Sequence, residues 1–172
     1  MQEAWSFKSL MNSKKLKKFI IGLIFLLIIF FIDRLTKILI LNIVDSTGKL
    51  DIYINSFLNL YLVWNKGIGF GLLSFDQDSI YNLITLLILL INLLIIYLIY
   101  IEKGIKTYFL VAILGGSFGN LFDRIYYNAV PDFIDLNYKG YHWFIFNVAD
   151  IFITVGIISL IIAELKKKTN EK

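Results

Sequence analysis

Long apolar blocks separated by short polar segments dominate the 172-residue chain. A helix needs about 20 mostly apolar residues to cross the hydrocarbon core of a bilayer, so each block predicts a membrane-spanning helix. The second block contains no charged residue, whereas the other three contain aspartates. The sequence therefore predicts an α-helical integral membrane protein with four spans in a single membrane domain, 1–172, with the spans at about residues 19–44, 80–101, 108–127 and 143–165.

The first outer loop, 45–79, carries a different pattern. Between Asp51 and Asn65 apolar and aromatic residues alternate in places with polar ones, which is typical of short β-strands. Several glycines follow between residues 67 and 71, and glycines in such positions indicate turns or close backbone approach. We expect a small, partly apolar β-sheet subdomain in this loop, lying on the outer membrane surface.

Composition supports a membrane protein and narrows its chemistry. The chain is 58% hydrophobic and 17% charged, whereas soluble domains are about 45–50% apolar and about 25% charged. It contains no Cys and a single His, which excludes disulfides, a Cys nucleophile and metal sites built from thiolates or several histidines. No metal and no cofactor are expected.

The distribution of lysines predicts the orientation of the spans. Eleven lysines lie before the first span, between the second and third, and in the tail, against three in the loops 45–79 and 128–142. By the positive-inside rule both termini are cytoplasmic and these two loops are outside. The basic segments that flank the spans could also contact membrane lipid, although the topology is sufficient to explain them. They do not indicate a nucleic-acid partner. The basic, then apolar, start of the chain lacks a small-residue cleavage site, so we expect an uncleaved anchor.

Carboxylates inside the predicted spans are the strongest functional signal. Placing one in hydrocarbon costs about 2.5–3.5 kcal/mol even on lenient scales, so such residues are functional candidates. At about 1.5 Å of rise per residue, Asp33, Asp123 and Asp150 all fall at one depth in the outer leaflet. Asp132, in the loop 128–142, could reach the same layer, and Asp135 is its rival for that position.

Structural alternatives exist for several of these groups. Asp33 and Lys37 are four residues apart on one helix face and can form an ion pair that docks the first span. Arg34 could extend to the outer interface by snorkelling. Asn120 and Arg124 share a helix face, and Arg124 could hold a nearby carboxylate in its ionised form.

Three chemistries can be weighed for this polar layer. Two neighbouring carboxylates share a proton, so that one activates a water and the other protonates the substrate. Asp132 and Asp150 suit this role, because one lies on a loop and the other on a helix beside Asn147. A Ser117–His142 pair is weaker, because its G-x-S-x-G pattern lies in a span, where small residues usually serve helix packing. A small membrane transporter or lipid-handling protein could use the same polar layer, although no charges continue it through the inner half.

Five segments resemble, in order, the conserved blocks of the type II (lipoprotein) signal peptidases. Each block alone would be weak, but together they extend from the first span to the last. They are Asp33–Lys37 for D-x-x-x-K, Asn65–Phe70 for N-x-G-x-x-F, Gly115–Arg124 for G-G-x-x-G-N-x-x-D-R, Val130–Phe133 for V-x-D-F and Phe146–Asp150 for F-N-x-A-D.

The resemblance implies an intramembrane aspartic endopeptidase of the bacterial cytoplasmic membrane, with its active site toward the extracytoplasmic side; we expect a monomer. Its substrates would be prolipoproteins whose lipobox Cys carries a diacylglyceryl group, cut immediately before that Cys. By motif, Asp132 and Asp150 would be the catalytic dyad. The positions that would bind substrate or orient the dyad are Asn120, Arg124 and Asn147, together with Asn65, Gly67, Asp33, Lys37 and Asp123.

Overall fold

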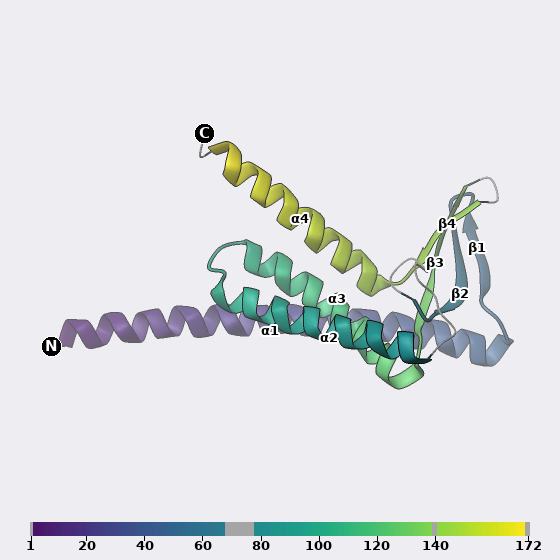
Figure 1. Cartoon of the computed structure of the whole chain (residues 1–172), viewed down its shortest axis with the longest axis horizontal. Coiled ribbons are helices and arrows are strands. Elements are labelled where there is room, and N and C mark those ends of the chain that lie inside the picture. Colours follow the sequence, from purple (N-terminus) through teal and green to yellow (C-terminus); the bar gives the residue numbers. More distant parts are fainter. Residues whose placement is uncertain (1, 68–77, 139–140, 171–172) are drawn as a thin grey trace.

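The computed structural model describes residues 2–67, 78–138 and 141–170. Within these residues the chain forms four helices and a four-stranded antiparallel sheet. The sheet stands at one end of the helices, and both termini lie toward the other end (Figure 1). The elements, in chain order, are α1 (Gln2–Thr47), β1 (Asp51–Asn55), β2 (Leu58–Asn65), α2 (Asp78–Ile101), α3 (Lys106–Tyr127), β3 (Val130–Tyr138), β4 (Tyr141–Phe146) and α4 (Val148–Asn170).

Three of these helices are long and apolar enough to cross a membrane among the described residues. Those segments are Lys15–Thr47, Ser79–Ile101 and Val148–Thr169. Helix α3 is more polar, and it packs against α1, α2 and α4. Its polar side chains are therefore covered by protein, while the other helices expose many Leu, Ile and Phe side chains. The predicted four-helix membrane fold is confirmed.

Glycines bring α3 close to two of its neighbours. A Cβ at Gly116 would lie 2.5 Å from the carbonyl oxygen of Ala149 on α4, and a Cβ at Gly119 would lie 2.5 Å from the Asp33 carboxylate on α1. A larger residue at Gly116 would require the backbone of α4 to move, and one at Gly119 would displace the buried Asp33 carboxylate. This agrees with the interpretation of the glycine-rich segment as a helix-packing surface.

The sheet is assembled from both outer loops. Its strand order is β1-β2-β3-β4, and β2 pairs with β3 along registers such as Asn59 with Asp135 and Trp64 with Pro131. The sheet predicted in the first outer loop is confirmed, but half of it comes from the second. The loop expected at 128–142 is mostly strand, and Asp132 is buried in β3 rather than carried on a flexible loop.

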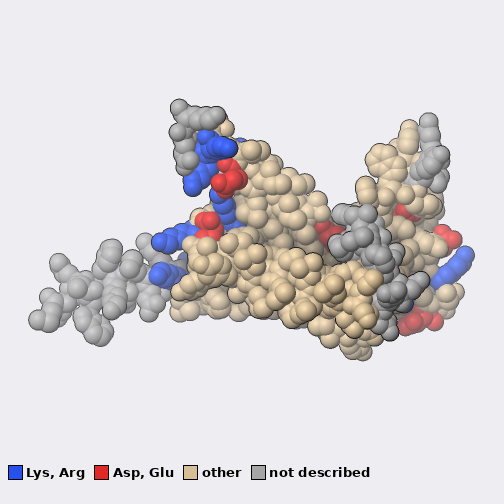
Figure 2. All heavy atoms as spheres, in the orientation of Figure 1, with Lys and Arg blue, Asp and Glu red and all other residues tan. Residues whose placement is uncertain are grey.

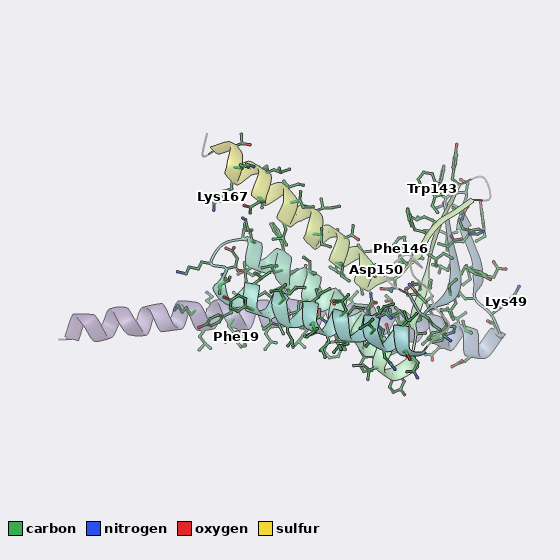
Figure 3. The ribbon with its side chains drawn as sticks, in the orientation of Figure 1. Phe19, Lys49, Trp143, Phe146, Asp150 and Lys167 are labelled. Carbon is green, nitrogen blue, oxygen red and sulfur yellow. The ribbon has the colours of Figure 1, made fainter. Side chains whose placement is uncertain are left out.

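The predicted start of the last span is also wrong. We expected a helix from Trp143, but residues 141–146 form β4 and α4 begins at Val148. A short apolar run does not by itself distinguish a buried strand from the end of a helix. The correction moves Asp150 into the first turn of α4, at the end that faces the sheet (Figure 3). The first helix is longer than expected and covers the predicted span 19–44.

Candidate active site

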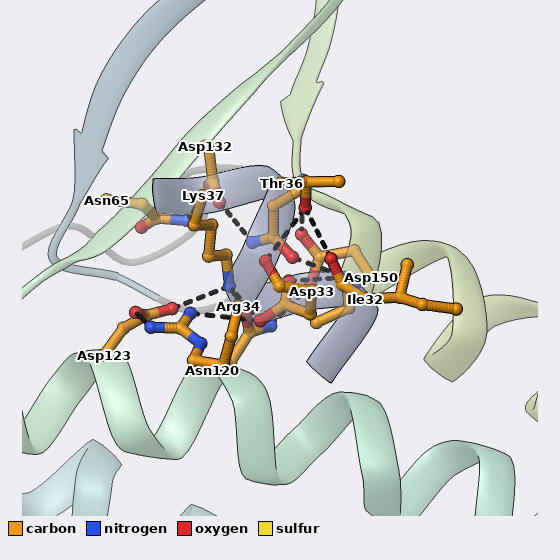
Figure 4. Close-up of polar contacts among 12 residues, drawn as sticks. Ile32, Asp33, Arg34, Thr36, Lys37, Asn65, Asn120, Asp123, Asp132 and Asp150 are labelled. Atoms are coloured by element: carbon orange, nitrogen blue, oxygen red, sulfur yellow. Dashed lines mark hydrogen bonds and ion pairs between the residues drawn. The ribbon is translucent and has the colours of Figure 1, made fainter. Parts of the chain in front are cut away.

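A cluster of buried polar side chains lies where α1, α3 and the start of α4 meet the sheet (Figure 4). Burying a polar group without a hydrogen bond or ion pair is costly, so each of these side chains is expected to have a partner within the protein. Two carboxylates, one from β3 and one from α4, lie at one side of the cluster, and an ion-pair network lies at the other. The buried members are Asp33, Arg34, Lys37, Asn65, Asp123, Arg124, Asp132, Asn147 and Asp150.

Asp132 and Asp150 are linked through one residue, Asn147. The Asn147 side chain donates to Asp132 Oδ1 at 2.6 Å, and its backbone N–H donates to Asp150 Oδ2 at 3.1 Å. Asn65 Nδ2 donates to Asp132 Oδ2 at 2.8 Å, and Asn120 Nδ2 donates to Asp150 Oδ1 at 2.8 Å. Each of the four carboxylate oxygens therefore accepts one N–H donor and keeps a further lone pair available.

The three asparagine side chains are fixed in orientation by second hydrogen bonds. Each Oδ1 accepts a hydrogen bond, so each Nδ2 must face a carboxylate. An exchange of amide oxygen and nitrogen would break two bonds at once. The donors to the three Oδ1 atoms are the Gly67 N–H for Asn65 at 2.8 Å, the Asp150 N–H for Asn147 at 3.2 Å and Lys37 Nζ for Asn120 at 2.9 Å.

The environment of Asp132 favours its protonated form. Burial raises its pKa, the negative charge of Asp150 raises it further, and the net result is a pKa of about 7. The amide donors of Asn65 and Asn147 act in the opposite direction, because they stabilise the carboxylate. Near neutral pH the pair can therefore hold a single proton, which is the state required for combined acid and base chemistry.

A buried ion-pair network supports this pair from α1 and α3. Lys37 Nζ lies 2.9 Å from Asp33 Oδ2 and 2.6 Å from Asp123 Oδ2. Arg34 lies 3.0 Å from Asp33 and 2.5 Å from Asp123. The predicted pairing of Asp33 with Lys37 is confirmed. The expected snorkelling of Arg34 is wrong, because two buried carboxylates hold its guanidinium inside the protein.

The network also positions the start of α4. Asp33 Oδ1 accepts the N–H of Ala149 at 3.0 Å, so a carboxylate of α1 binds a first-turn N–H group of α4. Helix N-termini leave such groups unpaired and favour negative charge. Asp150, the next residue, is thereby held at a fixed place relative to α1 and α3.

Arg124 has a different partner from the one expected. We expected it to act beside Asn120, but its guanidinium donates to the carbonyl oxygen of Gly67, just after β2. Its own carbonyl accepts a hydrogen bond from Tyr81 on α2 at 2.9 Å. Among the described residues, Arg124 Nε and Nη1 have no hydrogen-bond partner. The last three residues of the N-x-G-x-x-F segment, 68–70, lie outside the described part of the chain.

Asp135 and His142 form a separate pair. Asp132 and Asp135 are three residues apart on β3, so their side chains lie on opposite faces of the strand. Asp135 Oδ2 lies 2.8 Å from His142 Nδ1 on β4. Asp135 is thus not the partner of Asp150. His142 contacts Asp135 and not Ser117 on α3, so the two do not form a Ser–His pair. The described residues contain no cluster of three or more His, Cys, Asp or Glu suited to a metal ion.

Sequence reasoning overlooked two contributors to the cluster. Arg34 was assigned to the interface although it neighbours Asp33, and that adjacency was the available signal. Tyr81, which bonds to the backbone of Arg124, carries no sequence signal, because a tyrosine in the first turn of a membrane-spanning helix is common at the interface.

Comparisons with known proteins agree with this geometry. Residues 23–166 match the family model described as signal peptidase (SPase) II. The chain is 54% identical to the lipoprotein signal peptidase of Pelagibacter ubique (strain HTCC1062), covering 94% of this chain and 99% of that protein. It is 36% identical to that of Anaplasma phagocytophilum (strain HZ), over 90% of this chain and 97% of the relative.

A solved structure supports the same conclusion. A bacterial membrane enzyme determined by the in meso method at 2.3 Å resolution superposes with a TM-score of 0.71 at 29% identity, covering 88% of this chain and 91% of that one. The fold, the match over most of the chain and the close relatives agree. The chain belongs to the signal peptidase II family of aspartic-type peptidases.

Proposed function

We propose that this protein removes signal peptides from diacylglyceryl-modified bacterial prolipoproteins by cutting the bond just before the lipidated Cys. The observation that carries the proposal is the linkage of Asp132 to Asp150 through Asn147. Both carboxylates are buried, each oxygen has one fixed donor, and no metal ion or nucleophilic side chain is needed. The names of the two relatives, lipoprotein signal peptidases, support the same substrate class.

In the proposed mechanism the two aspartates share one proton and a water. Asp150 takes a proton from the water as the water oxygen attacks the scissile carbonyl, and Asp132 gives its proton to the carbonyl oxygen. The tetrahedral gem-diol then collapses: the C–N bond breaks, Asp150 gives its proton to the leaving amine of the lipidated Cys, and one hydroxyl of the diol returns a proton to Asp132. The raised pKa of Asp132, about 7, supports its assignment as the acid.

Three asparagines keep the carboxylates in position during these proton transfers. Asn65, Asn120 and Asn147 all donate to the dyad and cannot exchange their amide atoms without loss of a second bond. Each is therefore a positioning residue. We assign to Arg124 the binding of a substrate carbonyl near the scissile bond, because its Nε and Nη1 have no partner among the described residues.

The substrate would approach through the membrane. Its acyl chains stay in lipid, its signal helix follows the bundle, and the scissile bond reaches the dyad under the sheet. The dyad then lies toward the extracytoplasmic side, as the distribution of lysines predicts. A helical peptide bond is shielded by its own hydrogen bond, so the substrate must unwind there before attack.

The test uses purified protein and a diacylglyceryl-modified lipobox peptide, with the unmodified peptide in parallel. Wild type should cut only the modified peptide. Asp132→Asn and Asp150→Asn should lose all measurable cleavage while they keep the thermal unfolding profile of a folded protein. Asp135→Asn is the matched control, since this buried aspartate of the same strand faces away from the dyad, and it should retain most activity. Full activity in either dyad variant would refute the mechanism.

A further inference from the structure

A cavity of about 470 Å³, wide open at the protein surface, lies far from the dyad, between the N-terminal half of α1 and the connection that joins α2 to α3. Three lysines line it, together with an aromatic hydroxyl and two apolar side chains. They are Lys17, Lys18, Lys103, Tyr108, Ile21 and Ile105.

The lysines of this cavity are not all used within the protein. Lys18 Nζ donates to the carbonyl oxygen of Glu102 at 3.1 Å, which ties α1 to the connection. The side-chain amines of Lys17 and Lys103 make no hydrogen bond or ion pair with any described residue. One oxygen of the nearby Glu102 carboxylate, Oε1, accepts the backbone N–H groups of Lys103 and Gly104. Two ammonium groups that have no partner in the described part of the chain therefore border the cavity.

The start of α3 adds to the positive potential of the cavity. The residue before the helix, Ile105, gives no side-chain cap, and the first turn contains no acidic residue. The N–H groups of Thr107 and Tyr108 already donate to the carbonyl oxygens of Gly104 and Ile105, at 3.3 and 3.0 Å, so this end contributes mainly its helix dipole, which favours an anion. Ile105 and Ile21, which both line the cavity, are exposed. An apolar rim thus adjoins an anion-binding centre.

We propose that this cavity binds the phosphate headgroup of an anionic phospholipid from the leaflet opposite the sheet. The phosphate lies between Lys17 and Lys103, Tyr108 supplies a hydroxyl donor, and the acyl chains cover Ile21 and Ile105. Basic pockets between membrane helices are known to hold such headgroups. The lipid would fix α1 against the α2–α3 connection at the end remote from the catalytic cluster.

Anionic lipid could also be attracted by the general positive charge of this surface, without a specific site. Lysines gather over this whole end of the molecule, including the C-terminal end of α4 (Figure 2). A general field attracts anionic lipid wherever lysines lie, whereas a built pocket requires its own lysines. The last turn of α4, with Lys167 and Lys168, therefore offers a control with the same charge change at the same end.

Native mass spectrometry of the purified full chain can distinguish the two. Wild type, mixed with equal amounts of phosphatidylglycerol and phosphatidylcholine, should retain phosphatidylglycerol preferentially. A lysine near such a headgroup contributes about fivefold to affinity, so Lys17→Gln/Lys103→Gln should bind about 25-fold more weakly. Each single substitution should lose about fivefold, which keeps the test available if the double variant is unstable.

The control double variant, Lys167→Gln/Lys168→Gln, should keep the wild-type preference. Equal losses in both double variants, or no preference in wild type, would overturn the proposal. Glycerol 3-phosphate, added at the same concentration, should not displace the lipid, because it has no acyl chains; full displacement would reject a lipid as the occupant. Peptide cleavage measured in lipid-free detergent should be unchanged in both double variants.

Discussion

The ammonium group of Lys37 on α1 donates to the side-chain oxygen of Asn120 on α3 at 2.9 Å. Because this oxygen is occupied, the amide nitrogen of Asn120 must point to Asp150, which it reaches at 2.8 Å. The buried ion-pair network and the dyad are therefore one connected structure. Lys37, which is two hydrogen bonds away from Asp150, therefore determines that the amide nitrogen of Asn120, and not its oxygen, faces the dyad.

Replacement of Asn120 tests this connection. Asn120→Ala removes one donor to a buried carboxylate, a bond worth about 1.5–3 kcal/mol, so kcat should fall about 10- to 100-fold. KM should change little, because the residue acts on Asp150 rather than on the bound peptide. Steady-state cleavage of the lipopeptide measures both constants.

Asn42→Ala is the matched control, since Asn42 is an exposed asparagine of α1. It should leave both constants unchanged. A rise in KM with normal kcat in Asn120→Ala would instead place Asn120 in substrate binding.

The pH dependence of cleavage follows from the raised pKa of Asp132. Below its pKa of about 7 the dyad holds the proton that the mechanism donates, and above it this proton is lost. The rate should therefore decline as the pH rises through about 7 to 9. Initial rates measured between pH 5.5 and 9.5 in one detergent, with unfolding followed at each pH, check the expectation. A rate that climbs steadily into alkaline pH would contradict a protonated partner in the dyad.

Buried and exposed ion pairs should differ sharply in their effect on stability. Asp123→Asn leaves Lys37 and Arg34 short of a carboxylate inside the protein, and breaking a buried pair costs about 3–5 kcal/mol. Asp51→Asn breaks only the exposed pair with Lys49, whose charged atoms lie 3.6 Å apart, and should cost at most about 1 kcal/mol. Thermal unfolding of the two variants in detergent compares them directly. Equal unfolding temperatures would show that the network contributes little to stability.

Close approach of α3 to α1 requires a glycine at position 119. In Gly119→Ala the new methyl group would meet the Asp33 carboxylate at 2.5 Å, so Asp33 must move away from the Ala149 N–H and from Lys37. We expect lower stability and at least tenfold lower cleavage, measured on the same preparation.

Gly22→Ala provides the comparison on α1. A methyl group there meets only a Val111 side-chain carbon, at an ordinary 3.7 Å, and alanine is the better helix former. Cleavage and stability should be equal to wild type or slightly higher. Equal behaviour of the two alanine variants would argue against close packing at Gly119.

Sequence reasoning succeeded where the physical signal is local. Apolar runs long enough for a bilayer predicted all four helices, and the spacing of Asp33 and Lys37 predicted their ion pair. It failed at residues 141–146, where an apolar strand continues directly toward a helix and the two share one hydrophobic run. It also misplaced Arg34, because whether a guanidinium reaches water or a buried carboxylate depends on α3, which is remote in sequence.

The amino-acid sequence alone determined the membrane class, the approximate helices and the residue types of the polar cluster, since hydrophobic length and the cost of burying charge act within each segment. Only the tertiary structure decided which polar groups meet. Asn147 links Asp132 to Asp150, and Lys37 orients Asn120, because β3, α1, α3 and α4 converge at one end of the bundle. Such contacts depend on how helices and strands that are distant in sequence pack together, so they cannot be predicted from the pattern of residues within any one segment.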